Sequence, residues 1–424
     1  MKKIDIDKYG FLRAINPKRH MRRFFTATVG ISAVLYLLIS LMAGDGHLLD
    51  IFFIRGQDFF MDSFNSIRDA AQGSGVYSER GVIYPPMANL IFLILSVFTP
   101  RVYNNTDFSS RYSWTAHRSC YVLAAVVIAV FCIVLFYTVY AATKRGSTVQ
   151  RILFALTIVI SVPVIYLLER GNIIALCLLS LTVFALTYNS KLPWKREVGL
   201  IALAFAFSIK LYPVVFGWLL IKDKRYKEIV RCVIYGAAML IIPSFFFGGP
   251  IFCAQHLFGN IFGFSTGSGN TISVVMNFLH FPAIVQSIVN ALIYLWVFVC
   301  GACFAISPFI RGREQWKTWV IGLVTIMCVP SLTGIYSWSF FIIPIIMMAN
   351  IKKQEFGRDE MLYFVFMTVP FIFVPFRFTY HVAPTDILLY AMTIALSAHA
   401  VRDTLNDFKR ARAEKKSLSI ESDK

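Results

Sequence analysis

Two carboxylates in the first long connection of the chain have a spacing that suits shared chemistry. Asp58 and Asp62 are four residues apart, so on a helix they lie on one face and point at the same volume. The rings of Phe59, Phe60 and Phe64 would partly shield them from water, which suits a carboxylate to general-base catalysis. The alternative interpretation is that these acids only keep a surface helix hydrated.

Isolated charges interrupt two apolar stretches of the chain. Lys210 lies in the middle of the run 198–221, and Arg170 lies in the polar break 169–172 of the run 152–188. An ionisable side chain at membrane depth is costly and indicates a substrate or ion path. The competing interpretations are a lysine that reaches out to the membrane surface, and a tight loop in which the neighbouring glutamate balances Arg170.

The other motifs indicate structure or argue against a class of site. Tyr84-Pro85-Pro86 predicts the start of a helix, where the missing N–H groups of proline have no cost. The seven histidines are scattered and form no HxxxH pair, so neither a metal site nor a cofactor is predicted. The glycine-rich stretch 263–270 lacks the Gly-Lys-Ser/Thr ending of a nucleotide-binding loop and is predicted to be an ordinary loop.

A strongly apolar chain must position these residues. Of its 424 residues, 57% are hydrophobic and 15% are charged, whereas a soluble domain carries about 25% charged residues. The sequence therefore predicts an all-α integral membrane protein, a polytopic bundle of about 10–12 transmembrane helices. The candidate spans are 24–43, 84–99, 119–143, 152–168, 172–189, 198–221, 229–247, 282–307, 318–332, 335–350, 360–376 and 387–401.

The position of the charge predicts how the chain is oriented. Lysine and arginine outnumber the acids by 41 to 23, a formal net charge of +18. By the positive-inside rule, the basic segment 1–23 and the basic tail 402–424 are predicted to be cytoplasmic and near the anionic headgroups of the bilayer, so nucleic acid is not a predicted partner. Between them, 24–401 is predicted to be a single transmembrane domain. The basic linkers 222–231, 310–317 and 351–358 are predicted to face the cytoplasm as well.

The connection 44–83 differs from the rest of the chain. It holds six of the 23 acids against three arginines, with apolar residues interleaved. This pattern predicts amphipathic helices in an outer loop at the membrane surface. The topology of 144–221 stays open, because basic residues flank both ends of the span 198–221, and Pro213 predicts a kink or a re-entrant element there.

Taken together, these residues resemble the GT-C superfamily of membrane glycosyltransferases, and most closely glycosyltransferase family 87, the polyprenol-phosphate-mannose-type enzymes. The resemblance covers about residues 24–345 and rests on five short motifs in order. These are Asp58-Phe59, Tyr77 with Tyr84-Pro85-Pro86, Arg170-Gly171-Asn172, Lys210 to Pro213, and Pro330 with Tyr336-Ser337-Trp338 and Pro344. Relatives often carry a histidine two residues after this late Ser-Trp pair, where this chain has Phe340, so Tyr336 is the nearest polar substitute.

The resemblance implies a GT-C-like fold and a set of site residues. In that family the donor is a sugar on a polyprenyl phosphate, and the essential aspartate lies in the first outer loop. Carried over to this sequence, Asp58 is the expected general base and Asp62 is the second candidate. The expected donor- and phosphate-binding residues are Tyr84, Arg170, Asn172, Lys210, Tyr212 and Tyr336.

The resemblance predicts an inverting glycosyltransferase of the plasma membrane with its active site on the outer face. It would move one sugar, mannose or a similar hexose or pentose, from a polyprenyl-phosphate donor to a glycolipid or glycan acceptor. Two other classes stay open. A polysaccharide polymerase or ligase that uses lipid-linked glycans would have its principal polar loop late in the chain. A secondary transporter or flippase usually has two related halves, and although Lys210 fits that class, no internal duplication is evident.

Overall fold

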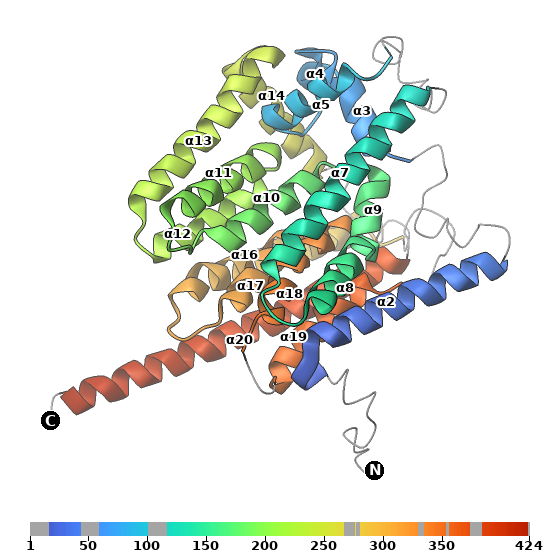
Figure 1. Cartoon of the computed structure of the whole chain (residues 1–424). Helices are drawn as coiled ribbons and strands as arrows, with labels where there is room; N and C mark the ends of the chain where they lie inside the picture. Colours follow the sequence, from blue (N-terminus) through green and yellow to red (C-terminus); the bar gives the residue numbers. More distant parts are fainter. Residues whose placement is uncertain are drawn as a thin grey trace. The chain divides into compact units, whose positions relative to one another are not determined.

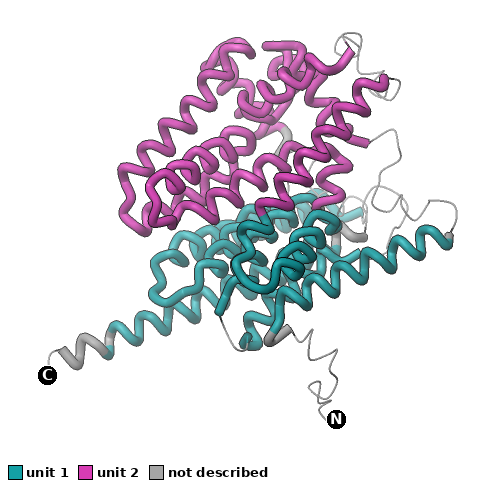
Figure 2. Tube along the Cα trace, viewed as in Figure 1, with its two compact units in different colours: residues 1–48, 139–163, 275–424 teal, residues 49–138, 164–274 magenta. Residues whose placement is uncertain are grey.

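A computed structural model of the chain shows two compact units that interleave along the sequence (Figure 2). Unit 1 comprises residues 1–48, 139–163 and 275–424, and unit 2 comprises residues 49–138 and 164–274. All of the described secondary structure is helical (Figure 1), which confirms the predicted all-α class. The structure describes residues 17–43, 59–100, 117–266, 280–329, 335–352, 356–373 and 384–422, together with Met276.

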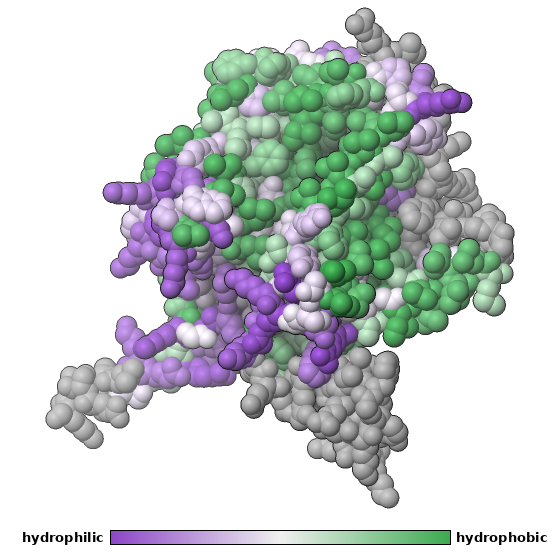
Figure 3. All heavy atoms as spheres, viewed as in Figure 1, coloured by the Kyte–Doolittle hydropathy of each residue, from purple (hydrophilic) through white to green (hydrophobic). Residues whose placement is uncertain are grey.

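Within the described residues, four helical stretches are long and apolar enough to span a membrane. A fifth counts if α8 (Thr148–Val159) and α9 (Val162–Arg170) form one broken span. Hydrophobic residues form a broad continuous area on the surface that Figure 3 shows. The chain is therefore a multi-pass membrane protein. The four stretches are His20–Met42 in α2 (Pro17–Ala43), Arg118–Ala142, which is α7, Tyr226–Phe247 with α13 (Tyr226–Ser244), and Ala283–Phe309 with α16 (Ala283–Ile306).

Other predicted spans contain shorter apolar helices. They include α5 (Pro86–Ser96), α10 (Ile174–Thr187) and the stretches Tyr212–Lys222 and Tyr336–Ala349. The 11 residues of α5 extend over about 16 Å, roughly half of the ~30 Å hydrocarbon core of a bilayer. Such helices cross a membrane only together with the segments that adjoin them.

Unit 2 has its core along α11 (Pro193–Ile209), which packs against α10 and α13. Leu178, Leu181 and Leu203 are among the fully or almost fully buried side chains there. α5 packs against α3 (Met61–Ala70), α11 and α13. The unit also contains most of α7 and α9, with α4 (Gly75–Ser78), η6 (Tyr212–Gly217), α12 (Trp218–Lys222), η7 (Phe245–Phe247) and α14 (Pro250–Thr266).

Two helix boundaries in unit 2 follow from proline and from backbone conformation. α5 begins at Pro86, after an extended Pro85, as the sequence predicts. α11 ends at Ile209 because Lys210 is extended (φ −145°, ψ 127°), and Pro213 lies in the 3-10 helix η6 that follows. The predicted break is confirmed, and it places Lys210 at the end of a helix.

Some elements differ from the sequence prediction. No span is predicted over 250–262, yet α14 begins at Pro250 and extends to Thr266, so the first residues of the predicted loop 263–270 are helical. Residues 267–270 lie outside the described residues. In unit 1, α20 (Pro384–Ser422) is far longer than the predicted span 387–401. Its later part is rich in alanine, lysine, arginine and glutamate, which are strong helix formers.

Unit 1 is organised around α17 (Gln315–Met327), whose side chains are almost all buried. α17 packs against α16, α18 (Ile342–Ala349) and α20, and α2 packs against α8 and α19 (Arg358–Thr368). The C-terminal part of α20 extends beyond the rest of this unit (Figure 1). The other described elements of unit 1 are η8 (Ser307–Phe309), η10 (Ile335–Phe341) and η11 (Val369–Phe371).

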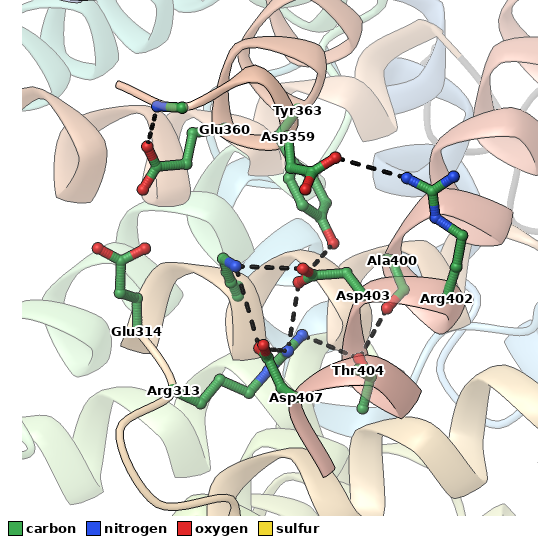
Figure 4. A network of polar contacts seen from close by, with 12 residues as sticks. Arg313, Glu314, Asp359, Glu360, Tyr363, Ala400, Arg402, Asp403, Thr404 and Asp407 are labelled. Atoms are coloured by element: carbon green, nitrogen blue, oxygen red, sulfur yellow. Dashed lines mark hydrogen bonds and ion pairs between the residues drawn. The ribbon is translucent and has the colours of Figure 1, made fainter. Parts of the chain in front are cut away.

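A network of buried charges joins α17, α19 and α20 (Figure 4). The side chain of Arg313, just before α17, is 1% exposed, and its Nη1 lies 3.3 Å from Asp403 Oδ2 and 2.5 Å from Asp407 Oδ2. Lys317 Nζ lies 3.2 Å from the other oxygen of Asp403. The Tyr363 hydroxyl of α19 donates to Asp403 Oδ2 at 3.2 Å. Two cations and two carboxylates bond directly, so the network fixes α20 against its neighbours.

Candidate functional site

The start of α3 docks on the polar loop 169–172 of unit 2, which comprises the last two residues of α9 and the first part of the turn that leads to α10. The backbone N–H of Phe60 donates to the Glu169 carbonyl at 2.6 Å, and the Ser63 hydroxyl donates to the Gly171 carbonyl. Gly171 has a φ of +62°, and a Cβ at this position would lie 2.7 Å from the Phe60 ring. Both the backbone conformation and the close approach of the ring therefore require glycine at position 171.

At this junction Asp62 binds the loop through both of its carboxylate oxygens. Its Oδ1 accepts from Arg170 Nε at 3.1 Å and from Arg170 Nη2 at 2.5 Å, and its Oδ2 accepts from Asn172 Nδ2 at 2.8 Å. The Oδ1 of Asn172 accepts from the backbone N–H of Ile174 at 3.0 Å, which satisfies a donor at the start of α10. The side chains of Arg170 and Asp62 are 18% and 20% exposed, so this pair is more strongly held than a solvated surface pair.

Lys210 supplies a second cation near the same carboxylate. Its ammonium group lies 4.2 Å from the centre of the Tyr84 ring, which is a cation–π contact. The ammonium group also interacts electrostatically with the carboxylate of Asp62. In the described part of the chain, this half-buried cation directly contacts an aromatic face rather than an acid.

Hydrogen bonds to the backbone determine where Tyr84 lies. The Tyr84 carbonyl accepts from the Tyr77 hydroxyl at 2.9 Å and from Asn89 Nδ2 at 3.3 Å. Burial raises the pKa of Tyr77, so its hydroxyl stays protonated and able to donate. From α14, Asn260 Nδ2 donates to the carbonyls of Tyr77 (3.0 Å) and Val82 (3.2 Å). The segment 77–84 is thus fixed from both α5 and α14.

The structure places most of the predicted site residues. Tyr212 lies at the start of η6, beside Cys177 of α10. Tyr336 lies on η10 in unit 1 and is half-buried. Asp58 lies outside the described residues. The residues that the structure brings together in unit 2 are Asp62, Tyr84, Arg170, Asn172 and Lys210, whose roles stay predictions.

Three polar residues that support the cluster are missed by the sequence interpretation. Asn89 is fully buried within α5, and Asn260 is half-buried within α14. A carboxamide inside an apolar helix needs hydrogen-bond partners, and this signal could have identified both residues. Ser63 carries no comparable signal, because serine is common at exposed positions and its partner lies 108 residues away.

The cluster can bind an anion and can accept a proton. Arg170 and Lys210 supply the cations, and Asp62 supplies a carboxylate. In the described ranges, no group of three or more histidine, cysteine, aspartate or glutamate side chains could hold a metal ion.

An all-α, multi-pass membrane protein with these groups gathered beside α3 has the features of the GT-C class of membrane glycosyltransferases. Residues 83–331, more than half of the chain, match the family model of glycosyltransferase family 87, and the chain belongs to that family. The resemblance inferred from the motifs is confirmed, and the protein is a membrane glycosyltransferase. The searches of curated proteins and of solved structures find no match. The matched range includes Tyr84, Arg170, Asn172, Lys210 and Tyr212 and leaves out Asp58, Asp62 and Tyr336.

Proposed function

We propose that the protein transfers a single sugar, mannose or a similar hexose or pentose, from a polyprenyl-phosphate donor to a glycolipid or glycan acceptor. Family membership supports glycosyl transfer as the reaction. One observation supports a phosphate-bearing donor. Arg170 forms an ion pair with Asp62, and Lys210, at the end of α11, interacts electrostatically with the same carboxylate. Two cations that both act on one carboxylate suit a phosphate, because charged N–H groups bind its oxygens strongly.

In the proposed reaction an acceptor hydroxyl attacks the anomeric carbon and inverts its configuration. A bond forms between the acceptor oxygen and this carbon, the bond from the carbon to the phosphate oxygen breaks, and a carboxylate takes the hydroxyl proton. Asp58 is the first candidate for this base and Asp62 is the second. Polyprenyl phosphate leaves with the bonding electron pair, and Arg170 and Lys210 stabilise the charge that develops on it.

The remaining residues of the proposed donor site are an amide and three tyrosines. Asn172 bonds the same carboxylate as Arg170, and Tyr84 holds the ammonium group of Lys210. Tyr212 and Tyr336 are proposed to bond sugar hydroxyls or phosphate while their rings pack against apolar groups.

The proposed location is the plasma membrane, with both termini in the cytoplasm and the site on the outer face. Support comes from the basic segments 1–23 and 402–424, which the positive-inside rule assigns to the cytoplasm. Because a single sugar is moved from a donor that is itself a lipid, the acceptor is proposed to be an envelope glycolipid or glycan.

The test is a reconstituted assay with purified protein in liposomes and a panel of polyprenyl-phosphate sugars. We expect wild-type turnover with one or more donors, and loss of about 100-fold or more in Asp58→Ala and Asp58→Asn. Asp69→Asn is the control, because Asp69 lies on α3 but bonds Arg68 rather than the loop 169–172. Full activity in both Asp58 variants would remove Asp58 as the base. No turnover with any such donor would contradict the donor class.

A further inference from the structure

The geometry around Asp62 assigns it a role other than proton transfer. We infer that Asp62 is a positioning residue, which fixes the guanidinium group of Arg170 for the phosphate of the donor. The inference rests on the proposed function, since it presupposes a phosphate-bearing donor at Arg170. It also separates the two candidate bases, because it leaves proton transfer to a group other than Asp62.

Both oxygens of Asp62 already accept hydrogen bonds. Oδ1 accepts two N–H groups of Arg170 at 3.1 and 2.5 Å, and Oδ2 accepts the amide of Asn172 at 2.8 Å. A general base must come within hydrogen-bond distance of the hydroxyl that it deprotonates. A carboxylate has about four acceptor positions, and Arg170 and Asn172 already use three of those of Asp62, so an acceptor hydroxyl is left with the remaining position on Oδ2.

The surrounding contacts are those of a fixed support. The Phe60 N–H bonds the Glu169 carbonyl and the Ser63 hydroxyl bonds the Gly171 carbonyl, so contacts on both sides of Asp62 hold α3 to the loop. A guanidinium group is planar, and a carboxylate oxygen that accepts from both Nε and Nη2 fixes which edge of the group faces Asp62. Asp62 therefore determines the direction in which Arg170 is presented.

Asp62 also affects the second cation. Its carboxylate acts electrostatically on Lys210, whose ammonium group lies over Tyr84. Loss of this carboxylate would release the Nε–Nη2 edge of Arg170 from its partner and would change the field at Lys210. Both effects act on the binding of an anion, so the inference predicts a change in donor KM. Loss of a base would instead lower kcat.

The experiment exchanges the carboxylate and the amide of the pair. Asp62→Asn places an amide opposite the amide of Asn172, and we expect the donor KM to rise by about tenfold with kcat changed by less than about threefold. The double variant Asp62→Asn with Asn172→Asp restores one carboxylate and one amide. Aspartate at 172 can still accept from the N–H of Ile174, so we expect the donor KM to return to within about threefold of wild type.

A matched control and a folding check accompany these variants. Asp69→Asn removes a carboxylate from the same helix, where Asp69 pairs with Arg68 at 3.2 Å, and we expect an unchanged donor KM. Thermal unfolding in detergent shows whether each variant is folded. If Asp62→Asn does not fold, Asp62→Glu keeps the charge but moves Arg170, and we again expect a higher donor KM with kcat retained.

The outcomes distinguish the inference from the proposed function. A fall in kcat of about 100-fold in folded Asp62→Asn, without recovery in the double variant, would identify Asp62 as the base and overturn the inference. An unchanged donor KM in Asp62→Asn would also overturn it. Wild-type protein without turnover on any polyprenyl-phosphate sugar would overturn the proposed function, and the inference with it. If the wild type turns over but the double variant Asp62→Asn with Asn172→Asp does not recover the donor KM, only the inference is overturned.

Discussion

Two clusters of charged side chains, one in each unit, use the same residue types in different ways. Around Arg313 in unit 1, two cations and two carboxylates bond one another directly (Figure 4). In unit 2, Asp62 bonds Arg170, while Lys210 lies over an aromatic ring. The first arrangement satisfies its charges within the protein. The second places one cation on a carboxylate and the other on an aromatic face.

The difference matters because burying a charge is costly in either case. Buried ion pairs contribute little net stability, although removal of one partner is strongly destabilising. A balanced network such as that of Arg313 therefore suits a structural joint. The contact with the face of Tyr84 leaves the charge of Lys210 unneutralised, and the proposed donor phosphate is a ligand of the right charge.

Removal of Arg170 is the strongest test of the unit 2 cluster. Arg170→Met deletes the guanidinium group that Asp62 holds, and we expect kcat/KM to fall by about 100-fold or more, because a preorganised donor of charge-stabilising N–H groups is lost. Steady-state assays with the polyprenyl-phosphate donor measure it. Arg170→Lys keeps the charge without the planar fork and should lie between this variant and wild type. Activity of Arg170→Met within threefold of wild type would contradict an anion-binding role.

Removal of Arg313 tests the other side of the comparison. Arg313→Met leaves Asp403 and Asp407 without their central cation, and we expect the free energy of unfolding to fall by about 3 kcal/mol. Thermal unfolding in detergent measures the change, and donor KM of the folded fraction should stay at its wild-type value. The control is Arg402→Met, whose pair with Asp359 is mostly exposed and contributes about 0–1 kcal/mol. A higher donor KM in Arg313→Met would contradict the assignment of a purely structural role to the cluster around Arg313.

Substitution of Gly171 tests how α3 is docked. Gly171→Ala adds a Cβ that would lie 2.7 Å from the Phe60 ring at a φ of +62°. We expect a stability loss of about 1–2 kcal/mol from the left-handed conformation alone, together with a higher donor KM as the loop 169–172 shifts. Gly217→Ala is a matched control, since the nearest side-chain atom to its Cβ, on Leu203, is 4.0 Å away. Equal stability of the two variants would show that the contact of the Phe60 ring with Gly171 does not constrain position 171.

Tyr84 tests whether the cation–π contact holds Lys210. Tyr84→Leu removes the aromatic face, and we expect the donor KM to rise by about tenfold, a value between what such contacts contribute when exposed and when desolvated. Tyr84→Phe keeps the face and loses only the hydroxyl, so it should stay within about threefold of wild type. A similar loss in both variants would indicate that the hydroxyl, not the ring, is what the donor site uses.

The smallest expected effect is at Tyr77. Tyr77→Phe removes the hydroxyl that donates to the Tyr84 carbonyl, while Asn89 still donates to the same oxygen. Loss of one such bond corresponds to about 1 kcal/mol, and we expect a rise in donor KM of a few-fold without a comparable change in kcat. The double variant Tyr77→Phe with Asn89→Leu should exceed the sum of the single effects if both fix one carbonyl.

Sequence patterns predicted the features that depend on residues close together in the chain, such as helix boundaries. Pro86 begins α5, and the break at Lys210 and Pro213 ends α11, as predicted. Arg170 and Lys210 were also recognised as candidate site residues, because a charge within an apolar run is costly wherever it lies. The helical, membrane-spanning character follows from the same apolar runs.

The pairing of these residues could not be read from the sequence. Asp62 and Arg170 are 108 residues apart, and which carboxylate meets which cation depends on how α3 packs on the loop after α9. The pair of Arg313 with Asp407, 94 residues apart, was missed for the same reason. α14 was missed because no span was predicted over 250–262, so its support of Tyr77 through Asn260 was not foreseen.

The docking of α3 on the loop 169–172 also constrains the order in which the protein is assembled. Ribosomes add about 5–20 residues per second, so Asp62 is synthesised about 5–20 s before Arg170, which lies 108 residues later. During this interval the Phe60 ring cannot yet pack on Gly171, its later contact. α3 therefore reaches its final position only after α9 and the start of α10 have been made. The Asp62–Arg170 pair of the proposed donor site therefore forms only after the chain has grown to residue 170 of its 424, well after Asp62 itself has been made.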